Sequence, residues 1–330
     1  MAQELSPGVA ASDVYAAAER IRPFIHRTPV LTSHRLDEMT GARLFFKCEN
    51  FQVSGAFKAR GAFNAVLSLS AEHAARGVAT HSSGNHGAAL ALAARTRGIP
   101  AWVVVPRDAS GFKRRAIERY GARVVACEPG LANREQRLAA LLAECGATVV
   151  HPYDDDRVIA GQGTVACELL EQVSGLDMLL SPVGGGGLLS GCALVARDQR
   201  PDMRVVAAEP AGADDCWQSM QSGRRVRLEQ VDTVADGLRA SIGARNWALI
   251  STLVDDVVRV EEAEIVAAMR LAWEVLKIVV EPSCAVPLAA LLSGRMDTAG
   301  ARVGVVLSGG NVDLDTLPGL LSTAGEGFRL

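Results

Sequence analysis

The sequence predicts an α/β protein with mainly parallel sheets, and three observations support this fold class. Short β-branched runs alternate with amphipathic or alanine-rich stretches, which is the pattern of successive βαβ units. The strand-like runs are continuously apolar, as expected where helices cover both faces of a sheet. No repeat of fixed period, low-complexity tract or long linker interrupts this alternation.

The strands and helices follow in order along the chain. Strands are predicted at 101–105, 122–127, 147–150, 177–183, 203–208, 256–260 and 302–307, and helices at 86–97, 112–120, 133–145 and 262–278. The segment 101–150 has the form β-α-β-α-β and is flanked on both sides by parts of a larger sheet. We therefore expect two three-layer α/β/α domains with a cleft between them. The small domain would span residues 74–153, and the large one residues 1–73 and 154–330.

Composition excludes several functional classes. The 330 residues carry a net charge of -3, which gives no strong field for nucleic acid or an anionic membrane surface. No apolar run has the length of a bilayer span, and the first residues, MAQELSPGVAASD, lack the features of a secretory signal. Seven cysteines without a C-x-x-C pair indicate reduced thiols, so we expect a cytoplasmic protein. The basic cluster around Arg225 is interpreted as a solvated loop.

The stretch SGAFKARGAFN, residues 54–64, places a lysine at the start of a predicted helix. Ser54 is a candidate N-cap, and Lys58 lies in the first turn, where the helix dipole disfavours a positive charge. Beside Phe57, this lysine should have a lowered pKa. A neutral amine is what a Schiff-base nucleophile needs. A single helical lysine is more often a surface charge, and the segment alone leaves that alternative open.

Two loops rich in small residues are candidate anion sites. SSGNHG (82–87) follows the strand-like GVATH and begins a helix, so free backbone N–H groups can face a carboxylate or phosphate. Simple capping by Ser83 is the alternative. GGGG (184–187) lies between a strand and an apolar helix, where its backbone can surround an anion. It is not a Walker A loop, because no Gly-Lys-Ser/Thr follows. The dinucleotide motif is incomplete, because its third glycine would stand at position 190, which is Ser190.

Two further loops follow predicted strands. Ser308 comes directly after the strand 302–307, at the edge where open α/β sheets bind ligands. Glu209 and Asp215 lie in EPAGADD after the strand 203–208 and have the oxygen donors of a hard cation site. Two acids in a loop are more often solvated, and composition alone favours that interpretation.

One cofactor, pyridoxal phosphate (PLP), needs an amine, an anion cradle, a partner for its ring nitrogen and a site for the carboxylate of an amino acid. The sequence resembles the fold type II, tryptophan-synthase-β-like enzymes, and within them the serine/threonine dehydratase and serine racemase group. The resemblance rests on KCENFQVSGAFKARGA, SSGNHG, HPYDDDRVIAGQGT, PVGGGG, AAEPAGADDCWQS, ADGLRASIG and LSGGNVDL. These blocks extend from about residue 20 to residue 315, nearly the whole chain.

The resemblance implies a role for each matching position, with PLP held in the cleft between the domains. For the cofactor, Lys58 forms the Schiff base, Phe57 packs beside the ring, Asn85 hydrogen-bonds the ring hydroxyl, Gly184, Gly185, Gly186 and Gly187 bind the phosphate, and Ser308 meets the ring nitrogen. For the substrate, the carboxylate is held by Ser82, Ser83, Asn85 and His86. For a divalent cation, Mg²⁺ or Mn²⁺ with Ca²⁺ as the alternative, the ligands are Glu209, Asp215 and the carbonyl of Ala213. A homodimer is also expected.

The reaction that we expect is elimination. A serine hydroxyl at the ring nitrogen does not force that nitrogen to be protonated, so prompt loss of a β-hydroxyl competes well. The chain would be an ammonia-lyase that converts L-serine, L-threonine or 3-hydroxyaspartate to a 2-oxo acid and ammonia. Arg134 aligns with an arginine near the substrate and would favour 3-hydroxyaspartate, although a solvated helix arginine in ANREQR is an equal alternative.

Two other functions stay open at this stage. Ser83 corresponds to the second acid/base group of the racemase-like members, which would make the chain a serine or aspartate racemase with Lys58 on the opposite face. Tyr153 in HPYDDD instead resembles the bacterial dehydratases. A third alternative is a nucleotide-binding or regulatory α/β protein that has lost catalysis.

Overall fold

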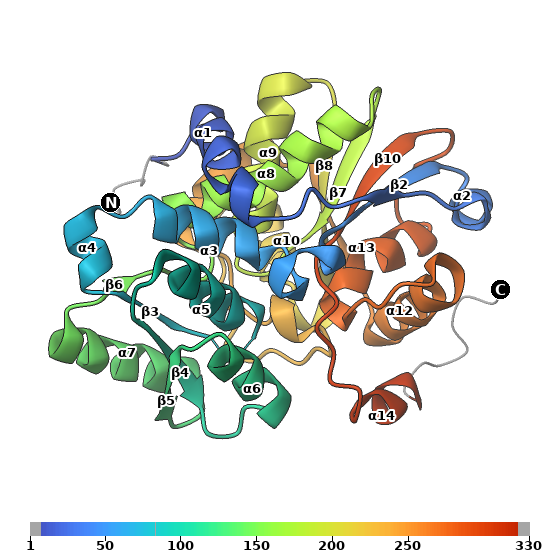
Figure 1. Cartoon of the computed structure of the whole chain (residues 1–330). Coiled ribbons are helices and arrows are strands. Elements are labelled where there is room, and N and C mark those ends of the chain that lie inside the picture. The colour runs from blue at the N-terminus through green and yellow to red at the C-terminus, as the bar shows by residue number, and fades with distance from the viewer. Residues whose placement is uncertain (1–7, 83, 323–330) are drawn as a thin grey trace.

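The computed structural model describes residues 8–82 and 84–322, and these form two sheets (Figure 1). The six-stranded sheet has the order β1 (Val30–Leu31), β2 (Arg43–Cys48), β10 (Arg302–Leu307), β7 (Met178–Pro182), β8 (Arg204–Pro210), β9 (Asp256–Val260). Only β1 is antiparallel to its neighbour within this sheet. The four-stranded sheet has the order β5 (Arg123–Cys127), β4 (Ala101–Pro106), β3 (Val78–His81), β6 (Thr148–Val149), and all its pairs are parallel.

Helices connect these strands throughout the described residues. They are α1 (Ala11–Ile21), α2 (His34–Thr40), α3 (Lys58–Leu67), α4 (Ala71–Ala75), α5 (Asn85–Arg97), α6 (Gly111–Arg119), α7 (Leu131–Cys145), α8 (Asp156–Gln172), α9 (Gly187–Gln199), α10 (Asp215–Ser222), α11 (Ala244–Leu253), α12 (Glu262–Leu276), α13 (Pro282–Leu292) and α14 (Leu317–Ser322). None of the helices within 8–82 and 84–322 has both the length and the hydropathy needed to cross a membrane.

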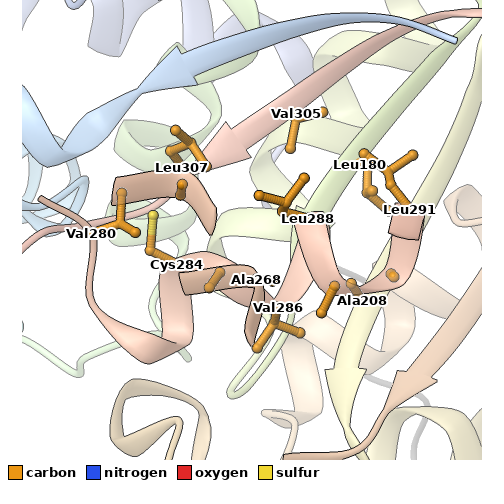
Figure 2. Close-up of a cluster of buried hydrophobic side chains, with 14 of the residues drawn as sticks. Leu180, Ala208, Ala268, Val280, Cys284, Val286, Leu288, Leu291, Val305 and Leu307 are labelled. Atoms are coloured by element: carbon orange, nitrogen blue, oxygen red, sulfur yellow. The ribbon is translucent and has the colours of Figure 1, made fainter. Parts of the chain in front are cut away.

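The large sheet is the middle of three layers, as the sequence predicts. Alternate residues of β8 point to opposite faces. Val206 and Ala208 belong to the core shared with α12 and α13, part of which Figure 2 shows. Val205 and Ala207 belong to the core shared with α8, α9 and α11. Both faces of the sheet are therefore covered, which explains the continuous apolar runs in its strands.

The small sheet repeats this arrangement. Val103 and Val105 of β4 pack with α5 and α6, and Val104 packs on the other face with α7. Figure 1 shows these helices beside the small sheet. The predicted fold class, two α/β units with mainly parallel sheets, is confirmed. Helix α3 packs against both α5 and α8, so it lies where the two units meet. The domain boundaries at residues 74 and 153 stay a prediction.

All seven predicted strands are present as β4 to β10 and the strand-like GVATH contains β3, but sequence reasoning missed the short β1 and also β2. Its sequence, RLFFKC, contains Lys47, which interrupts the apolar run that identifies a buried strand. Lys47 is fully buried, and its amine donates to Glu168 at 2.6 Å, to Gln172 at 2.8 Å and to the carbonyl of Thr28 at 2.8 Å. Because these partners compensate the charge, the lysine is tolerated in the interior.

A buried ion network fixes the start of α3. The guanidinium of Arg60, with no exposed surface, donates to both carboxylate oxygens of Glu49 at 2.7 Å and to both oxygens of Glu168 at 2.8 and 2.9 Å. Removing one partner of a buried ion pair leaves an uncompensated charge, which strongly disfavours movement of the network. The network therefore holds the first turn of α3, two residues from Lys58, against α8 and the turn 49–51.

Candidate active site

A cavity of about 530 Å³ lies between the two units, a volume typical of small-molecule sites. Its wall contains most of the predicted site residues: Phe57, Lys58, Ser82, Asn85, His86, Arg134, Gly184, Gly185, Gly186, Gly187 and Ser308. Glu209, Ala213 and Asp215 do not line it. Ser83 lies outside the described residues. Segments far apart in the sequence thus meet at one cavity.

Lys58 is the first residue of α3, close to the predicted helix start. Its amine donates a hydrogen bond of 2.9 Å to the carbonyl of Pro152. Burial lowers the pKa of Lys58 to about 8, and the opposing charge of Glu281 limits the decrease. The lowered pKa was expected, but burial is its main cause. The ring centroid of Phe57 lies 4.9 Å from the amine.

The prediction that Ser54 caps this helix is wrong. Ser54 lies in the 3-10 turn Val53–Gly55 with a φ of 63°, and Phe57 occupies the N-cap position without a side-chain hydrogen bond. The chain is extended at Ala56, which pairs with Gly309 in an isolated bridge. This pairing prevents the helix from starting earlier.

The glycine quartet connects β7 to α9. Gly186 is the N-cap of α9 with a φ of 93°, a conformation that favours glycine. A Cβ at Gly184 would lie 2.8 Å from the Cα of Leu238, and one at Gly185 would lie 2.3 Å from the ring of Tyr153. Leu238 and Tyr153 thus occupy the space that a side chain at either glycine would need. The free N–H groups at the N-terminus of α9 form a site suited to a phosphate.

Ser308 follows β10 at its carboxyl end and is 3% exposed. Its carbonyl accepts a hydrogen bond of 3.0 Å from the N–H of Phe57. Together with the Ala56–Gly309 bridge, this bond ties the segment before Lys58 to the end of the strand. The hydroxyl of Ser308 and the amine of Lys58 therefore belong to neighbouring parts of the cavity wall.

A polar cluster surrounds Asn85, the first residue of α5. The amide of Asn85 donates to the carboxylate of Glu281 at 2.9 and 3.2 Å, and its oxygen accepts from Asn311 at 3.0 Å. Burial raises the pKa of Glu281 to about 8 despite the bonds from Asn85. Sequence reasoning missed Glu281 and Asn311. The sequence offers only local signals for these two residues. Asn311 lies in the motif LSGGNVD, and Glu281 directly precedes the proline that begins α13.

Three histidines line the cavity beside Lys58. Burial lowers the pKa of His81 to about 4 and that of His86 well below its usual value, and it also lowers the pKa of His151. The rings of His81 and His151 meet edge to face at 5.7 Å, and those of His151 and Tyr153 at 4.6 Å. The lowered pKa values favour the neutral form of all three rings.

Charged side chains from both units also line the cavity. Lys113 of α6 pairs with Asp236, which joins the small unit to the large one. Arg134 of α7 lines the cavity, and the only hydrogen bond described for its guanidinium is to the carbonyl of Gly130 at 3.4 Å. The sequence predicts a solvated loop for Arg225 and Arg227. The loop is present, but both side chains line the cavity.

The residues of the candidate cation site do not line the cavity, although Asp215 is hydrogen-bonded to the backbone of Ile242, which does. Glu209 accepts hydrogen bonds from the N–H groups of Cys216 at 3.0 Å and Trp217 at 2.9 Å, and Asp215 accepts one from Ile242 at 2.8 Å. Burial raises the pKa of Glu209 well above its usual value and that of Asp215 to about 6. Among the described residues, no group of three or more His, Cys, Asp or Glu side chains is placed to hold a metal.

The chain is similar to known proteins over nearly its full length. The family model described as pyridoxal-phosphate dependent enzyme matches residues 21–309. A serine racemase of Arabidopsis thaliana is 52% identical, covering 91% of this chain and 92% of that protein. A beta-hydroxyaspartate dehydratase of Paracoccus denitrificans (strain Pd 1222) is also 52% identical, covering 93% and 97%. The structure of maize serine racemase superposes with a TM-score of 0.92 at 45% identity, covering 95% and 97%.

The fold and the cavity thus define a cofactor-dependent α/β enzyme. The chain belongs to the pyridoxal-phosphate-dependent enzymes, in the fold type II group that contains serine/threonine dehydratases and serine racemases.

Proposed function

We propose that this chain is an ammonia-lyase that removes water from a β-hydroxy amino acid and yields a 2-oxo acid and ammonia. One observation carries the proposal: an amine with a pKa of about 8 lies in the same cavity as a glycine turn at a helix N-terminus. This combination supplies a nucleophile for an aldehyde and a cradle for a phosphate.

The residues present fit pyridoxal phosphate. Lys58 would bind its aldehyde, the backbone of Gly184 to Gly187 its phosphate, and Ser308 its ring nitrogen, with Phe57 beside the ring. When bound, the cofactor supplies an electron sink for the charge left at the substrate α-carbon. Burial lowers the pKa of His81, His86 and His151, so the histidines beside Lys58 favour their neutral forms.

Lys58 is then the base that takes the α-proton. Its pKa of about 8 leaves a substantial neutral fraction near neutral pH, and proton transfer is efficient when the pKa of the base lies near the working pH. The Pro152 carbonyl holds the amine at the cavity wall. Backbone and side-chain groups of Ser82, Ser83, Asn85 and His86 would hold the substrate carboxylate.

A dicarboxylic substrate, 3-hydroxyaspartate, is the preferred member of the substrate class, with L-serine and L-threonine as alternatives. The 52% identity to a beta-hydroxyaspartate dehydratase supports this choice. Arg134 supports it too, because this arginine lines the cavity without a carboxylate partner among the described residues. A guanidinium in that position suits a second carboxylate.

Racemisation is the second candidate function. The equal identity to a serine racemase favours it, together with Ser83 in the sequence, which would act on the face opposite Lys58. Both activities can share one site, since each begins with removal of the α-proton.

A divalent cation, Mg²⁺ or Mn²⁺, is proposed at Glu209, Asp215 and the Ala213 carbonyl. The two carboxylates are buried, have raised pKa values and form no ion pair within the described part of the chain, which fits binding of a hard cation.

We also propose a cytoplasmic homodimer with a mobile small unit, residues 74–153. Phe51 and Val279 support the dimer, because these apolar side chains are 45% and 47% exposed and Asn50, next to Phe51, donates to the carbonyl of Val279.

Two measurements test the main proposal. Borohydride treatment of the yellow protein should bleach it and leave the label on Lys58, whereas a colourless protein without label contradicts the proposal. A panel of L-serine, L-threonine, 3-hydroxyaspartate and D-serine is then assayed for oxo-acid release and for the enantiomer that remains. Oxo-acid release is expected to exceed racemisation, and the reverse would make the second candidate the main activity.

A further inference from the structure

Asn246 is a fully buried amide behind the glycine turn. It is the third residue of α11, has no exposed surface and does not line the cavity. Its side-chain nitrogen donates to two backbone carbonyls, that of Gly185 at 2.8 Å and that of Tyr153 at 3.0 Å. The orientation of the amide is settled by these partners, because the flipped amide would face two carbonyl oxygens with its own oxygen.

The two carbonyls belong to different parts of the proposed cofactor site. Gly185 is in the glycine quartet, and Tyr153 directly follows Pro152, whose carbonyl accepts from the Lys58 amine. A single side chain therefore joins the phosphate cradle to the segment that orients the reactive amine.

The bond to Gly185 also fixes a peptide plane. The Gly185 carbonyl accepts a second hydrogen bond from the N–H of Gly243 at 3.1 Å, so it is held toward the start of α11. In a trans peptide, C=O and N–H point in opposite directions. The N–H of Gly186 must then point away from α11. A Cβ at Gly186 would lie 2.8 Å from the Cβ of Asn246, so the two residues are in close contact.

The start of α11 is itself anchored. The carboxylate of Asp154 accepts from the N–H groups of Ala244 at 3.2 Å and Arg245 at 3.0 Å. Asn246 thus lies in the anchored first turn of a helix and not in a loop. Its side-chain oxygen is buried and has no hydrogen-bond partner within the described residues.

We propose that Asn246 is a positioning residue that sets the geometry of the phosphate cradle and couples it to Lys58 through Tyr153 and Pro152. This inference rests on the proposed function, because it assumes that the glycine turn holds the cofactor phosphate. Asn246 contacts neither cofactor nor substrate in this assignment. It acts by directing the Gly186 N–H and by holding the 152–153 segment.

The test compares the holoenzyme of Asn246→Ala with the wild type in three readouts. The first is the dissociation constant of pyridoxal phosphate, expected to rise at least about tenfold because buried carbonyls lose their donor. The second is the ³¹P resonance of the bound phosphate, expected to shift. The third is the pH midpoint of the visible absorption band, expected to move because the carbonyl partner of Lys58 is displaced.

Asn64→Ala is the matched control. Asn64 is 3% exposed, and its amide donates to the carbonyl of Arg157 at 2.7 Å, but it lies away from the glycine turn and does not line the cavity. It should lower the melting temperature yet preserve the cofactor affinity and the ³¹P position. If Asn246→Ala does not fold, Asn246→Ser, which keeps a short donor, is measured instead.

Three outcomes would overturn the inference. Asn246→Ala could lose only melting temperature, with unchanged affinity, ³¹P resonance and pH midpoint. Asn64→Ala could weaken cofactor binding equally, which would make the effect global. A wild-type chain that binds no pyridoxal phosphate would overturn the proposed function as well, so that failure is distinguishable from the first two.

Discussion

The amine of Lys58 donates to the carbonyl oxygen of Pro152 at 2.9 Å, and this contact joins the first turn of α3 to the crossing from β6 into α8. A carbonyl partner favours the charged amine, whereas burial favours the neutral one. Burial has the larger effect, because the pKa of Lys58 falls from 10.5 to about 8.

The first prediction concerns the pH dependence of cofactor attachment. Only the neutral amine attacks an aldehyde, so the rate at which the apoprotein takes up pyridoxal phosphate should rise with pH and level off above about 8. Stopped-flow absorbance measures this rate. Lys58→Ala should show no covalent uptake and should lose activity by about 10³-fold or more. A midpoint near 10.5 would indicate a solvated amine instead.

Glu281 gives the second prediction, which concerns stability. Its pKa rises from 4.5 in the unfolded chain to about 8 in the folded one, so the folded state binds the extra proton between these values. The stabilisation is complete below about pH 4.5 and is lost as the pH rises through about 8. Glu281→Gln should therefore show a smaller decrease in melting temperature from pH 5 to pH 8 than the wild type. Parallel melting curves would mean that Glu281 does not titrate in this range.

The sequence predicted the layers and most of the strands because burial on both faces produces apolar runs such as those of β7 and β10. It missed β2 because the charge of Lys47 is compensated by Glu168, 121 residues further along the chain. It also misplaced the start of α3. Ser54 has the chemistry of a cap, but the Ala56–Gly309 bridge, a long-range contact, fixes the backbone before Lys58.

The difference between local sequence signals and long-range contacts also explains which residues of the candidate site were expected. Lys58, the glycine quartet and Ser308 were expected at one site from their places at strand or helix junctions together with the family resemblance, and all of them line the cavity. Glu281, Asn311 and Asn246 were not expected there, because their contacts are with partners brought close only by folding. Asn85 and Glu281, for example, are separated by 196 positions.

The third prediction concerns the cation. A chelator should lower the melting temperature by roughly 2–4 °C, and Mg²⁺ or Mn²⁺ should restore it, because a ligand that binds only the folded state stabilises it. Asp215→Asn should abolish this response. Asp214→Asn is the control, since Asp214 pairs with Arg259 at 2.8 Å and is not a proposed ligand. Indifference of the wild type to chelator would remove the cation from the proposal.

The fourth prediction separates the two candidate reactions. Ser83→Ala should remove racemisation and leave much of the elimination of the natural enantiomer, because only racemisation needs a proton donor on the face opposite Lys58. Chiral chromatography of the remaining serine and a coupled assay of the oxo acid measure the two rates in one sample. Equal loss of both activities would contradict the assignment of two faces.

The fifth prediction tests the substrate class. Arg134→Gln should raise the KM for 3-hydroxyaspartate roughly tenfold or more, because a charged hydrogen bond to the second carboxylate is lost. The KM for L-serine, which lacks that carboxylate, should change little. Arg137→Gln is the matched control, since Arg137 lies on the same helix, pairs with Glu144 at 3.3 Å and does not line the cavity. An equal change in KM for both substrates would show that Arg134 does not bind the second carboxylate. Serine or threonine would then be the better substrate assignment.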